Sequence, residues 1–415
     1  MINKSFSLYL LGIMFGYNMV AIAQIPSTHV VKENSSIKTS IMESSSFDTI
    51  YIEKGIYKEY DIVIDKPLTI IGNDFPIIDG LEKESIFHIN SDYVTIRGLE
   101  IKNVGFSHTN EFAAIHISDS DHFTVEHNKL ANVFFGIIVE SSNNGIIRFN
   151  DIEGNSDQEF YAGNGVHVWK SKHIEIANNK LRRLRDGIYF EFVDHSTVKG
   201  NVSTNNIRYG LHFMFSNNDD YVDNRFENNG AGVAVMFSKR LKMKNNLFKQ
   251  NWGATSFGLL LKEIYDADIT NNKFLKNTVA IQVEGSSRIN YLHNTFEENG
   301  WAIKVSGGCY ENRILKNDFL SNSFDVAFNS NLNESKFDGN YWSSYSGYDL
   351  DKNGVGDVPY RPVKLFSYIS HRSPESIILI RSLFIELLNF SEMISPIFTP
   401  VQLEDQSPKM YPIND

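Results

Sequence analysis

The chain has 415 residues, of which 42% are hydrophobic and 21% charged, a balance typical of a folded protein with enough apolar material for a core. Its formal net charge of −11 excludes nucleic acid as the main partner, because phosphate binding needs a clustered basic surface. The single cysteine, Cys309, excludes an internal disulfide, so stability has to come from packing and backbone pairing.

The first 23 residues have the features of an export signal. Lys4 gives a basic start, the stretch 6–20 is mostly apolar, and Ala21 and Ala23 fit a small-x-small cleavage site. The apolar stretch is short for a membrane anchor, which needs about 20 residues. We therefore expect residues 1–23 to be a signal peptide and the chain to be exported to the periplasm.

An internal repeat of about 22 residues organises most of the remaining chain. Its first marker is asparagine, at Asn128, Asn150, Asn179, Asn201, Asn224, Asn246, Asn272, Asn294, Asn317 and Asn340. Its second is a small residue, at Ala114, Gly136, Gly165, Gly187, Gly210, Gly232, Gly258, Ala280 and Ala302. Short alternating runs between the markers predict β-strands, and the constant interval predicts that successive turns stack. We expect an all-β fold, a right-handed parallel β-helix over residues 24–362, in which the asparagines form a buried structural ladder.

The alternation also predicts which side chains face outward. The first and third residues after each small residue are apolar in every turn and should face the core. The second and fourth should face outward, where four adjacent turns carry an unusual set for a solvated strand: His167, Trp169, Tyr189, Glu191, His212, Met214 and Met236. We expect His167, Trp169, Tyr189 and Glu191 to line a surface groove, and the insertions at 151–164 and 250–257 are loops that can wall it.

Three of these outward residues are candidate ligands of Cu(I). Met214 and Met236 occupy the same position in neighbouring turns, and His212 lies two residues before Met214 on the same face. Thioether and imidazole are soft to intermediate donors that suit Cu(I). The alternative is that the methionine pair forms an apolar contact surface for another protein.

The repeat ends after Asn340 and is followed by an acidic loop at 349–357. Asp349, Asp351, Asn353 and Asp357 have the spacing of a calcium loop, although the bidentate acid of a full EF-hand is missing. The loop is therefore either a structural calcium site or a plain turn, and in neither case catalytic.

The last segment, 363–415, should contain a helix and an extended tail. Ser373, Pro374 and Glu375 form a strong helix start, and the helix should run towards Pro396. Its apolar residues nearly encircle it, so it has to be buried on more than one side, either as a lid over the open end of the coil or docked on a membrane partner.

Cell-envelope polysaccharide binding, or a polysaccharide hydrolase or lyase activity, is the alternative function for such a coil. A glycosidase needs two facing carboxyl groups about 5 to 9.5 Å apart. The adjacent Asp219 and Asp220 point in different directions in a strand, so we predict no catalytic residues.

Three long motifs, at 186–195, 208–217 and 230–240, together with 348–362 and the Ser373 helix start, resemble the NosD family of periplasmic maturation proteins of nitrous oxide reductase. The resemblance covers almost the whole chain after the signal and is weakest in the C-terminal tail. It implies a β-helix that helps to assemble the copper-sulfide cluster of nitrous oxide reductase, its client, without being an enzyme itself. The implied partners are the permease and ATPase of an ABC transporter and a copper-chaperone lipoprotein. The matching motifs contain His212, Met214 and Met236.

Overall fold

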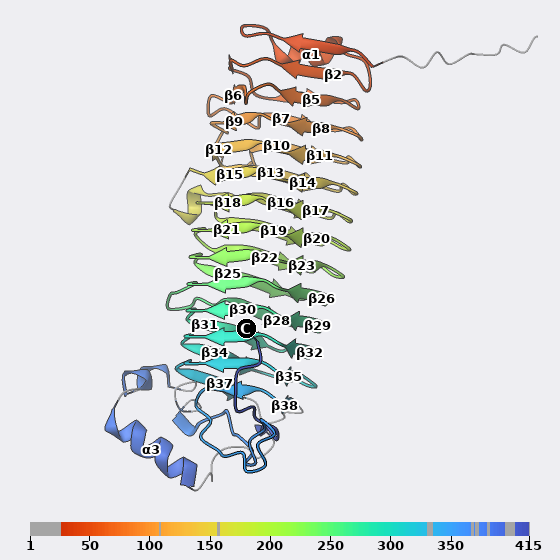
Figure 1. Ribbon diagram of the computed structural model, residues 1–415. Coiled ribbons are helices and arrows are strands. Elements are labelled where there is room, and N and C mark those ends of the chain that lie inside the picture. Colours follow the sequence, from red (N-terminus) through yellow and green to blue (C-terminus); the bar gives the residue numbers. More distant parts are fainter. Residues whose placement is uncertain are drawn as a thin grey trace, which may run out of the picture.

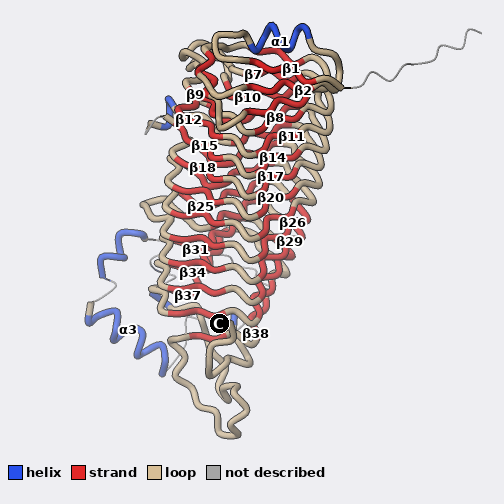
Figure 2. The backbone as a smooth tube through the Cα atoms, turned by 45° about the horizontal axis from the view of Figure 1, so that its top comes forward, coloured by secondary structure: helices blue, strands red, loops and turns tan. Residues whose placement is uncertain are grey.

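The computed structural model describes residues 26–107, 109–155, 158–329, 335–366, 369, 373–379, 382–394 and 403–414. The expected signal peptide, 1–23, lies outside these residues. The described chain winds into a tall coil whose turns stack on one another (Figure 1). Three parallel sheets form its walls, as Figure 2 also shows, so the predicted parallel β-helix is confirmed.

The strands of each sheet come from successive turns. The 14-stranded sheet contains β1 (Thr28–Val31), β2 (Thr49–Ile52), β5 (Thr69–Gly72), β8 (Thr95–Arg97), β11 (Thr124–Glu126), β14 (Ile146–Arg148), β17 (Glu175–Ala177), β20 (Thr197–Lys199), β23 (Asp220–Val222), β26 (Lys239–Lys244), β29 (Tyr265–Thr270), β32 (Ser287–Leu292), β35 (Arg313–Leu315) and β38 (Lys336–Asp338). The 12-stranded sheet contains β4 (Ile62–Ile64), β7 (Phe87–Ile89), β10 (Ala113–Ser118), β13 (Phe135–Glu140), β16 (Val166–Trp169), β19 (Asp186–Glu191), β22 (Tyr209–Met214), β25 (Ala231–Met236), β28 (Leu259–Lys262), β31 (Val279–Glu284), β34 (Trp301–Ser306) and β37 (Phe324–Asn329). The 13-stranded sheet contains β3 (Ile56–Tyr57), β6 (Ile77–Asp79), β9 (Glu100–Lys102), β12 (Lys129–Val133), β15 (Asp151–Gly154), β18 (Lys180–Arg182), β21 (Val202–Thr204), β24 (Arg225–Glu227), β27 (Leu247–Lys249), β30 (Lys273–Leu275), β33 (Thr295–Glu297), β36 (Asp318–Leu320) and β39 (Tyr341–Trp342). The helices are α1 (Ile37–Glu43), the 3₁₀ helices η1 (Glu159–Tyr161) and η2 (Pro374–Leu379), and α3 (Leu383–Ile394).

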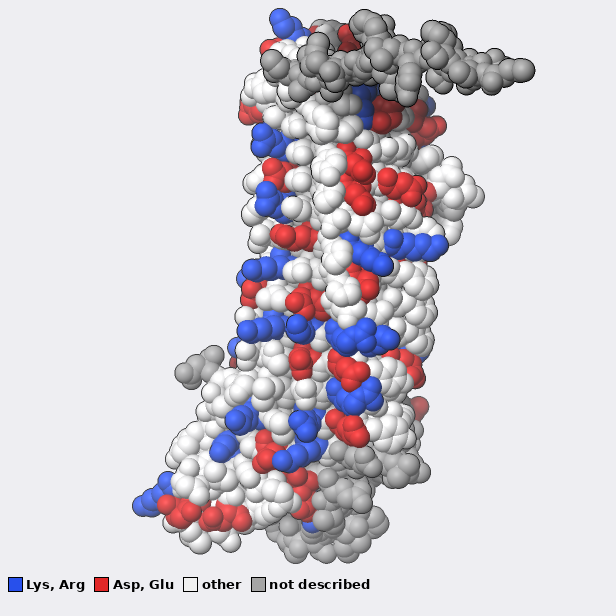
Figure 3. All heavy atoms as spheres, turned by 90° about the vertical axis from the view of Figure 1, so that its right-hand side faces the viewer, with Lys and Arg blue, Asp and Glu red and all other residues white. Residues whose placement is uncertain are grey.

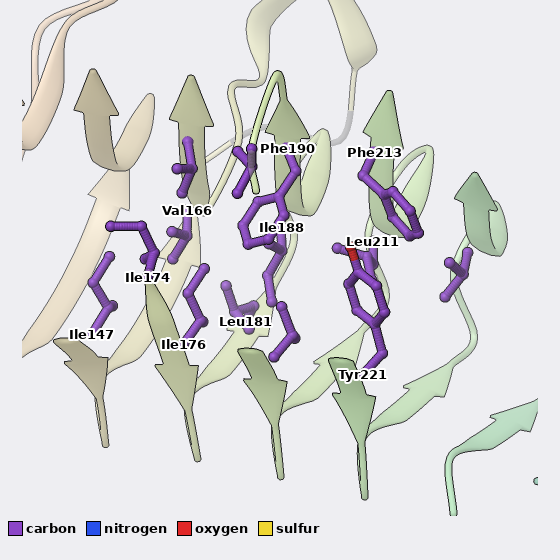
Figure 4. Close-up of a cluster of buried hydrophobic side chains, with 14 of the residues drawn as sticks. Ile147, Val166, Ile174, Ile176, Leu181, Ile188, Phe190, Leu211, Phe213 and Tyr221 are labelled. Atoms are coloured by element: carbon purple, nitrogen blue, oxygen red, sulfur yellow. The ribbon is translucent and has the colours of Figure 1, made fainter. Parts of the chain in front are cut away.

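Columns of like side chains fill the inside of the coil. Ile137 lies in register between Ile115 and Val166, and all three are fully buried. Figure 4 shows such columns from two facing sheets, and the rings of Phe213 and Tyr221 stack between two of these columns with centroids 4.6 Å apart. Strands in register place the same position of every turn in one column. The first and third residues after each small residue are buried, so the predicted inward parity of the strands is confirmed.

The predicted asparagine ladder is a continuous chain of buried amides. The side-chain oxygen of Asn150 accepts hydrogen bonds from the backbone N–H and the side-chain amide of Asn128, at 3.0 and 3.1 Å. The Asn150 amide in turn donates to Asn179 and to the carbonyl of Val125. Repetition of this pattern from turn to turn leaves the polar groups at this corner paired, as buried polar groups have to be.

A second amide ladder, which was not predicted from the sequence, runs along another corner. It links Asn206, Asn229, Asn251, Asn277, Asn299 and Asn322. Near the start of this ladder, a serine replaces the large apolar side chain of the neighbouring turns. Ser203 stands in a core column of large side chains, where its hydroxyl donates to the carbonyl of Gly210 and accepts from the Asn206 amide.

The two ends of the coil are closed differently. At the N-terminal end the coil begins at Thr28, and α1 covers it with Ile37 and Ile41 buried. At the C-terminal end the tail folds back onto the last turn. Asp405 is fully buried and accepts hydrogen bonds from the backbone N–H of Asn340, the Asn340 amide and the Trp342 indole, at 2.9, 2.9 and 3.0 Å. A carboxylate thus terminates the first asparagine ladder.

The expectation that the C-terminal helix forms the lid is therefore wrong, because the tail does so. The helix is also not continuous from Ser373, since η2 and α3 are separate elements. α3 lies beside the last turns of the coil (Figure 1), where Ile385 and Phe366 pack in one cluster with outward residues of the 12-stranded sheet such as Leu260 and Ala327.

Replacing Asp405 by Ala should destabilise the C-terminal end of the coil. It leaves several buried N–H groups without acceptors, and each costs about 1–3 kcal/mol, so we expect a total loss of roughly 3 kcal/mol or more. Urea unfolding of the parent and the variant measures the difference. Asp338→Asn, which breaks a surface ion pair with Lys336 on the last turn, is the control and should cost less than about 1 kcal/mol. Equal effects of the two substitutions would contradict the capping role.

Candidate functional site

The outward residues singled out in the sequence lie together on the outer face of the 12-stranded sheet. Trp169, Glu191, Met214 and Met236 form one column in register along β16, β19, β22 and β25. His167, Tyr189 and His212 form the column beside it. We call these seven residues the outer face cluster.

The two sulfur donors are direct neighbours. Met214 pairs with Met236 in the parallel register, so their backbones are separated by about 4.8 Å, and both side chains are half-buried. Next to His212, the partner on β25 is Ala234, whose small side chain leaves the imidazole uncrowded on that side. The face therefore supplies two thioethers and one imidazole from two adjacent strands.

His212 is covered by other side chains. It faces away from the core, yet only 6% of its surface is exposed. Tyr209 lies over it with ring centroids 4.9 Å apart, and Phe257, from the insertion at 250–257, stacks on Tyr209 at 6.2 Å. The insertion thus forms part of a roof over the imidazole, and an ion has to pass this roof to reach it.

His167 and Tyr189 continue the buried stripe from His212 towards the N-terminal end. Tyr189 contacts His167 and His212 edge to face, with ring centroids 4.7 and 5.1 Å apart, and donates a hydrogen bond to Glu191. Burial, assisted by the charge of Arg185, lowers the pKa of His167 to about 4, and burial raises the pKa of Tyr189 to about 12. Both side chains are therefore uncharged at neutral pH.

A hollow of about 580 Å³ adjoins this stripe. Glu111, Phe135, Phe160 and Arg185 are among the residues that line it, and Phe135 lies 5.8 Å from the His167 ring. Phe160 belongs to η1 in the insertion at 151–164, so this insertion does wall the hollow. None of the seven members of the outer face cluster lines this hollow, so the groove expected along His167, Trp169, Tyr189 and Glu191 stays a prediction.

Buried polar atoms without a hydrogen-bond partner concentrate on this face of the described chain. They are Nε2 of His116, the side-chain nitrogen of Asn164, Nδ1 of His167, Oδ2 of Asp186, and both ring nitrogens of His212. Since a buried polar group without a partner costs free energy, such a concentration indicates a binding surface more than a structural one. Asp186, Asn164 and Tyr209 were not predicted as site residues from the sequence. Each of the three directly precedes a small ladder residue, at a position that is mostly apolar in the other turns.

The acidic loop lies apart from this face, at the C-terminal end of the coil. Asp349 accepts hydrogen bonds from the backbone N–H groups of Asn353 and Gly354, and Asp357 accepts one from Leu350. Asp351 and Asn353 are exposed. The loop is thus folded by its own amides, and calcium binding there stays a prediction.

The two adjacent acids are separated by the sheet. Asp219 is fully buried inside the coil, where burial raises the pKa of its carboxyl group to about 8, whereas Asp220 is half-buried on the outside. They cannot act as a facing pair.

The face seen in Figure 3 mixes lysines and arginines with acids over its whole height.

In the part of the chain that the structure describes, no group of three or more His, Cys, Asp or Glu side chains is arranged so as to hold a metal ion. Nor does any helix in the described ranges have the length and apolar content to cross a membrane.

Comparison with known proteins gives a consistent result. Residues 150–347 match the family model described as "Periplasmic copper-binding protein (NosD)", a range that contains the whole outer face cluster. The chain is 27% identical to a probable ABC transporter binding protein NosD of Pseudomonas aeruginosa, over 84% of this chain and 85% of that protein. It is also 27% identical to the protein of the same name from Stutzerimonas stutzeri, over 84% and 83% of the two chains.

Among solved structures, the surface adhesin PfbA of Streptococcus pneumoniae matches with a TM-score of 0.55 at 13% identity. The match covers 72% of this chain and 95% of that one. At this identity the likeness concerns the fold alone.

Calcium should stabilise the protein through the loop at 349–357. Binding to the folded state raises the free energy of unfolding by mass action, by about 2.7 kcal/mol at a free concentration 100 times Kd. We expect a higher Tm in calcium than in chelator, and no difference in Asp351→Ala. Asp65→Ala, an exposed carboxylate near the other end of the coil, should keep the response. A parent Tm that is the same in calcium and in chelator would show the loop to be a plain turn.

Proposed function

For a chain that belongs to the NosD family, we propose the role of a periplasmic accessory protein that handles Cu(I) during assembly of the copper cluster of nitrous oxide reductase. Copper is the cargo in this proposal, and Met214, Met236 and His212 are its ligands. The observation that carries it is the register of the two thioethers beside an imidazole whose ring nitrogens are unpartnered. The description of the family as copper-binding supports it.

The donor set fits Cu(I) better than other common metal ions. Thioethers are soft ligands that favour Cu(I), whereas zinc, calcium and magnesium favour imidazole, carboxylate and water. Two donors on one strand and one on the next place the site on the outer wall of the coil, beneath the roof that an ion has to pass on its way to a client. The roof of Tyr209 and Phe257 limits access of water to this site.

The double substitution Met214→Leu and Met236→Leu should lower the affinity for Cu(I) at least roughly 100-fold, because it removes both sulfurs while keeping size and apolarity. Competition with a Cu(I) chelator under reducing conditions measures the affinity. Met243→Leu, which removes a sulfur buried inside the coil on β26, is the control and should leave the affinity unchanged. Equal affinity of the double variant and the parent would refute the copper site, and a scaffold that holds client and transporter together without metal would then explain the face better.

We further propose that α3 docks the protein onto the ABC transporter of the same assembly system, whose ATPase and permease act with it and with a copper-chaperone lipoprotein. One side of α3 packs on the coil through Ile385 and Leu388. The other side exposes four large apolar residues: Leu383 (70%), Phe384 (62%), Leu387 (58%) and Phe390 (57%). An apolar stripe of this size on an outer helix suits a protein contact. The names of the two relatives as transporter binding proteins support the choice of partner.

Replacing Phe384 by Ser and Leu387 by Ser should abolish binding to the detergent-solubilised permease–ATPase complex and leave the Tm unchanged, because both side chains are exposed. Co-purification measures the binding. Met42→Ser, an exposed apolar residue on α1 at the other end of the coil, is the control. Undiminished co-purification of the double variant would refute docking through α3. Substitutions serve better here than truncation, since removing residues 373–415 would also remove the Asp405 cap.

A further inference from the structure

One buried carboxylate stands where the outer face of the 12-stranded sheet is otherwise mostly apolar. The residues directly before the small ladder positions are Ala113, Phe135, Asn164, Asp186, Tyr209, Ala231, Phe257, Val279 and Trp301. Asp186 is the only carboxylic acid in this column, and it is fully buried. A buried carboxylate is costly unless it is paired, so its position needs a cause.

The partners of Asp186 satisfy only one of its two oxygens. Oδ1 accepts a hydrogen bond from the backbone N–H of Tyr209 at 3.3 Å and lies 3.7 Å from Nε of Arg208. Oδ2 has no hydrogen bond and lies 3.6 Å from Nδ1 of His212, on the adjacent strand. The backbone thus anchors the carboxylate with its free oxygen towards the imidazole.

Aromatic rings and the carboxylate of Asp186, 3.6 Å from Nδ1, surround His212. Tyr189 and Tyr209 lie against the imidazole, and neither ring nitrogen has a hydrogen-bond partner. Hydrogen bonds of this kind are often long before a ligand binds and shorten when it does. A small rotation of the imidazole is enough to bring Nδ1 into hydrogen-bond range of Oδ2.

We infer that Asp186 is a positioning residue for His212: its carboxylate holds the ring proton on Nδ1 and thereby leaves the lone pair of Nε2 free for a ligand. In metal sites a carboxylate behind the imidazole fixes the tautomer and the ring orientation in this way. The inference deepens the proposed function, because it rests on His212 as a Cu(I) ligand, and it assigns Nε2 as the donor atom. The tautomer itself exists without copper and can be measured without it.

Nitrogen-15 NMR of the histidine rings in the full chain tests the inference without metal. The resonances of His212 are identified by their loss in His212→Gln. We expect the parent to carry the proton on Nδ1, and Asp186→Asn to shift the population towards the Nε2–H form, because the amide lacks the charge that favours Nδ1–H. Asp219→Asn, which replaces another fully buried carboxyl group that lies inside the coil, should leave the tautomer unchanged.

Cu(I) affinity of the same proteins separates this inference from the proposed function. Asp186→Asn should weaken binding by roughly 10- to 100-fold, as loss of such a partner commonly does, and Asp219→Asn should not. A parent His212 with its proton on Nε2, or a tautomer unaltered in Asp186→Asn, would overturn the inference whether or not copper binds. A tautomer that shifts as expected in a parent that binds no Cu(I) would uphold the positioning of His212 and refute the copper role alone. A variant that does not fold leaves the parent tautomer as the deciding measurement.

Discussion

The structure depends on the stacking of one turn on the next through parallel strand pairing with buried amide ladders at two corners. Parallel pairing places the same repeat position of every turn in one column, so a single favourable contact, an amide on an amide or a ring on a ring, is repeated along the coil. The same constraint makes the ends vulnerable, because the last turn has no neighbour to satisfy its ladder. Asp405 replaces the missing asparagine there, and α1 covers the other end.

The outer face cluster results from this stacking. A face built of columns brings side chains from different turns to strand spacing without any local motif, and so Met214 meets Met236. The coil itself provides only a flat wall, however, and the covering comes from elements that leave the repeat. Phe257 in one insertion roofs His212, Phe160 in another lines the hollow beside His167, and α3 covers the outer face near the C-terminal end. The outer face cluster thus lies where insertions and a helix outside the repeat cover the regular surface of the coil.

One uncharged histidine, His167, and a buried acid, Asp186, give this face a special electrostatic character. His167 is held neutral by burial and by the charge of Arg185, while Asp186 sits behind His212 with one oxygen free. Neutral imidazoles retain a lone pair and can bind a soft cation, whereas protonated ones cannot. Because these groups are buried, few other partners can satisfy a ring nitrogen when the proton is on the other nitrogen. The tautomer of each histidine therefore matters here.

The sequence by itself determined the parallel β-helix, the inward parity, the first asparagine ladder and the register of Met214 with Met236, since all of these are periodic and a period is visible in one chain. The resemblance of the motifs around Asp186, Met214 and Met236 indicated the family. Only the tertiary structure decided that Tyr209 and Phe257 cover His212, that Asp186 stands behind it, that the tail closes the coil and that α3 lies on the outer face. These contacts join residues far apart in the chain or belong to insertions with no period, and their partners are chosen by the shape and the unsatisfied polar groups of the assembled coil.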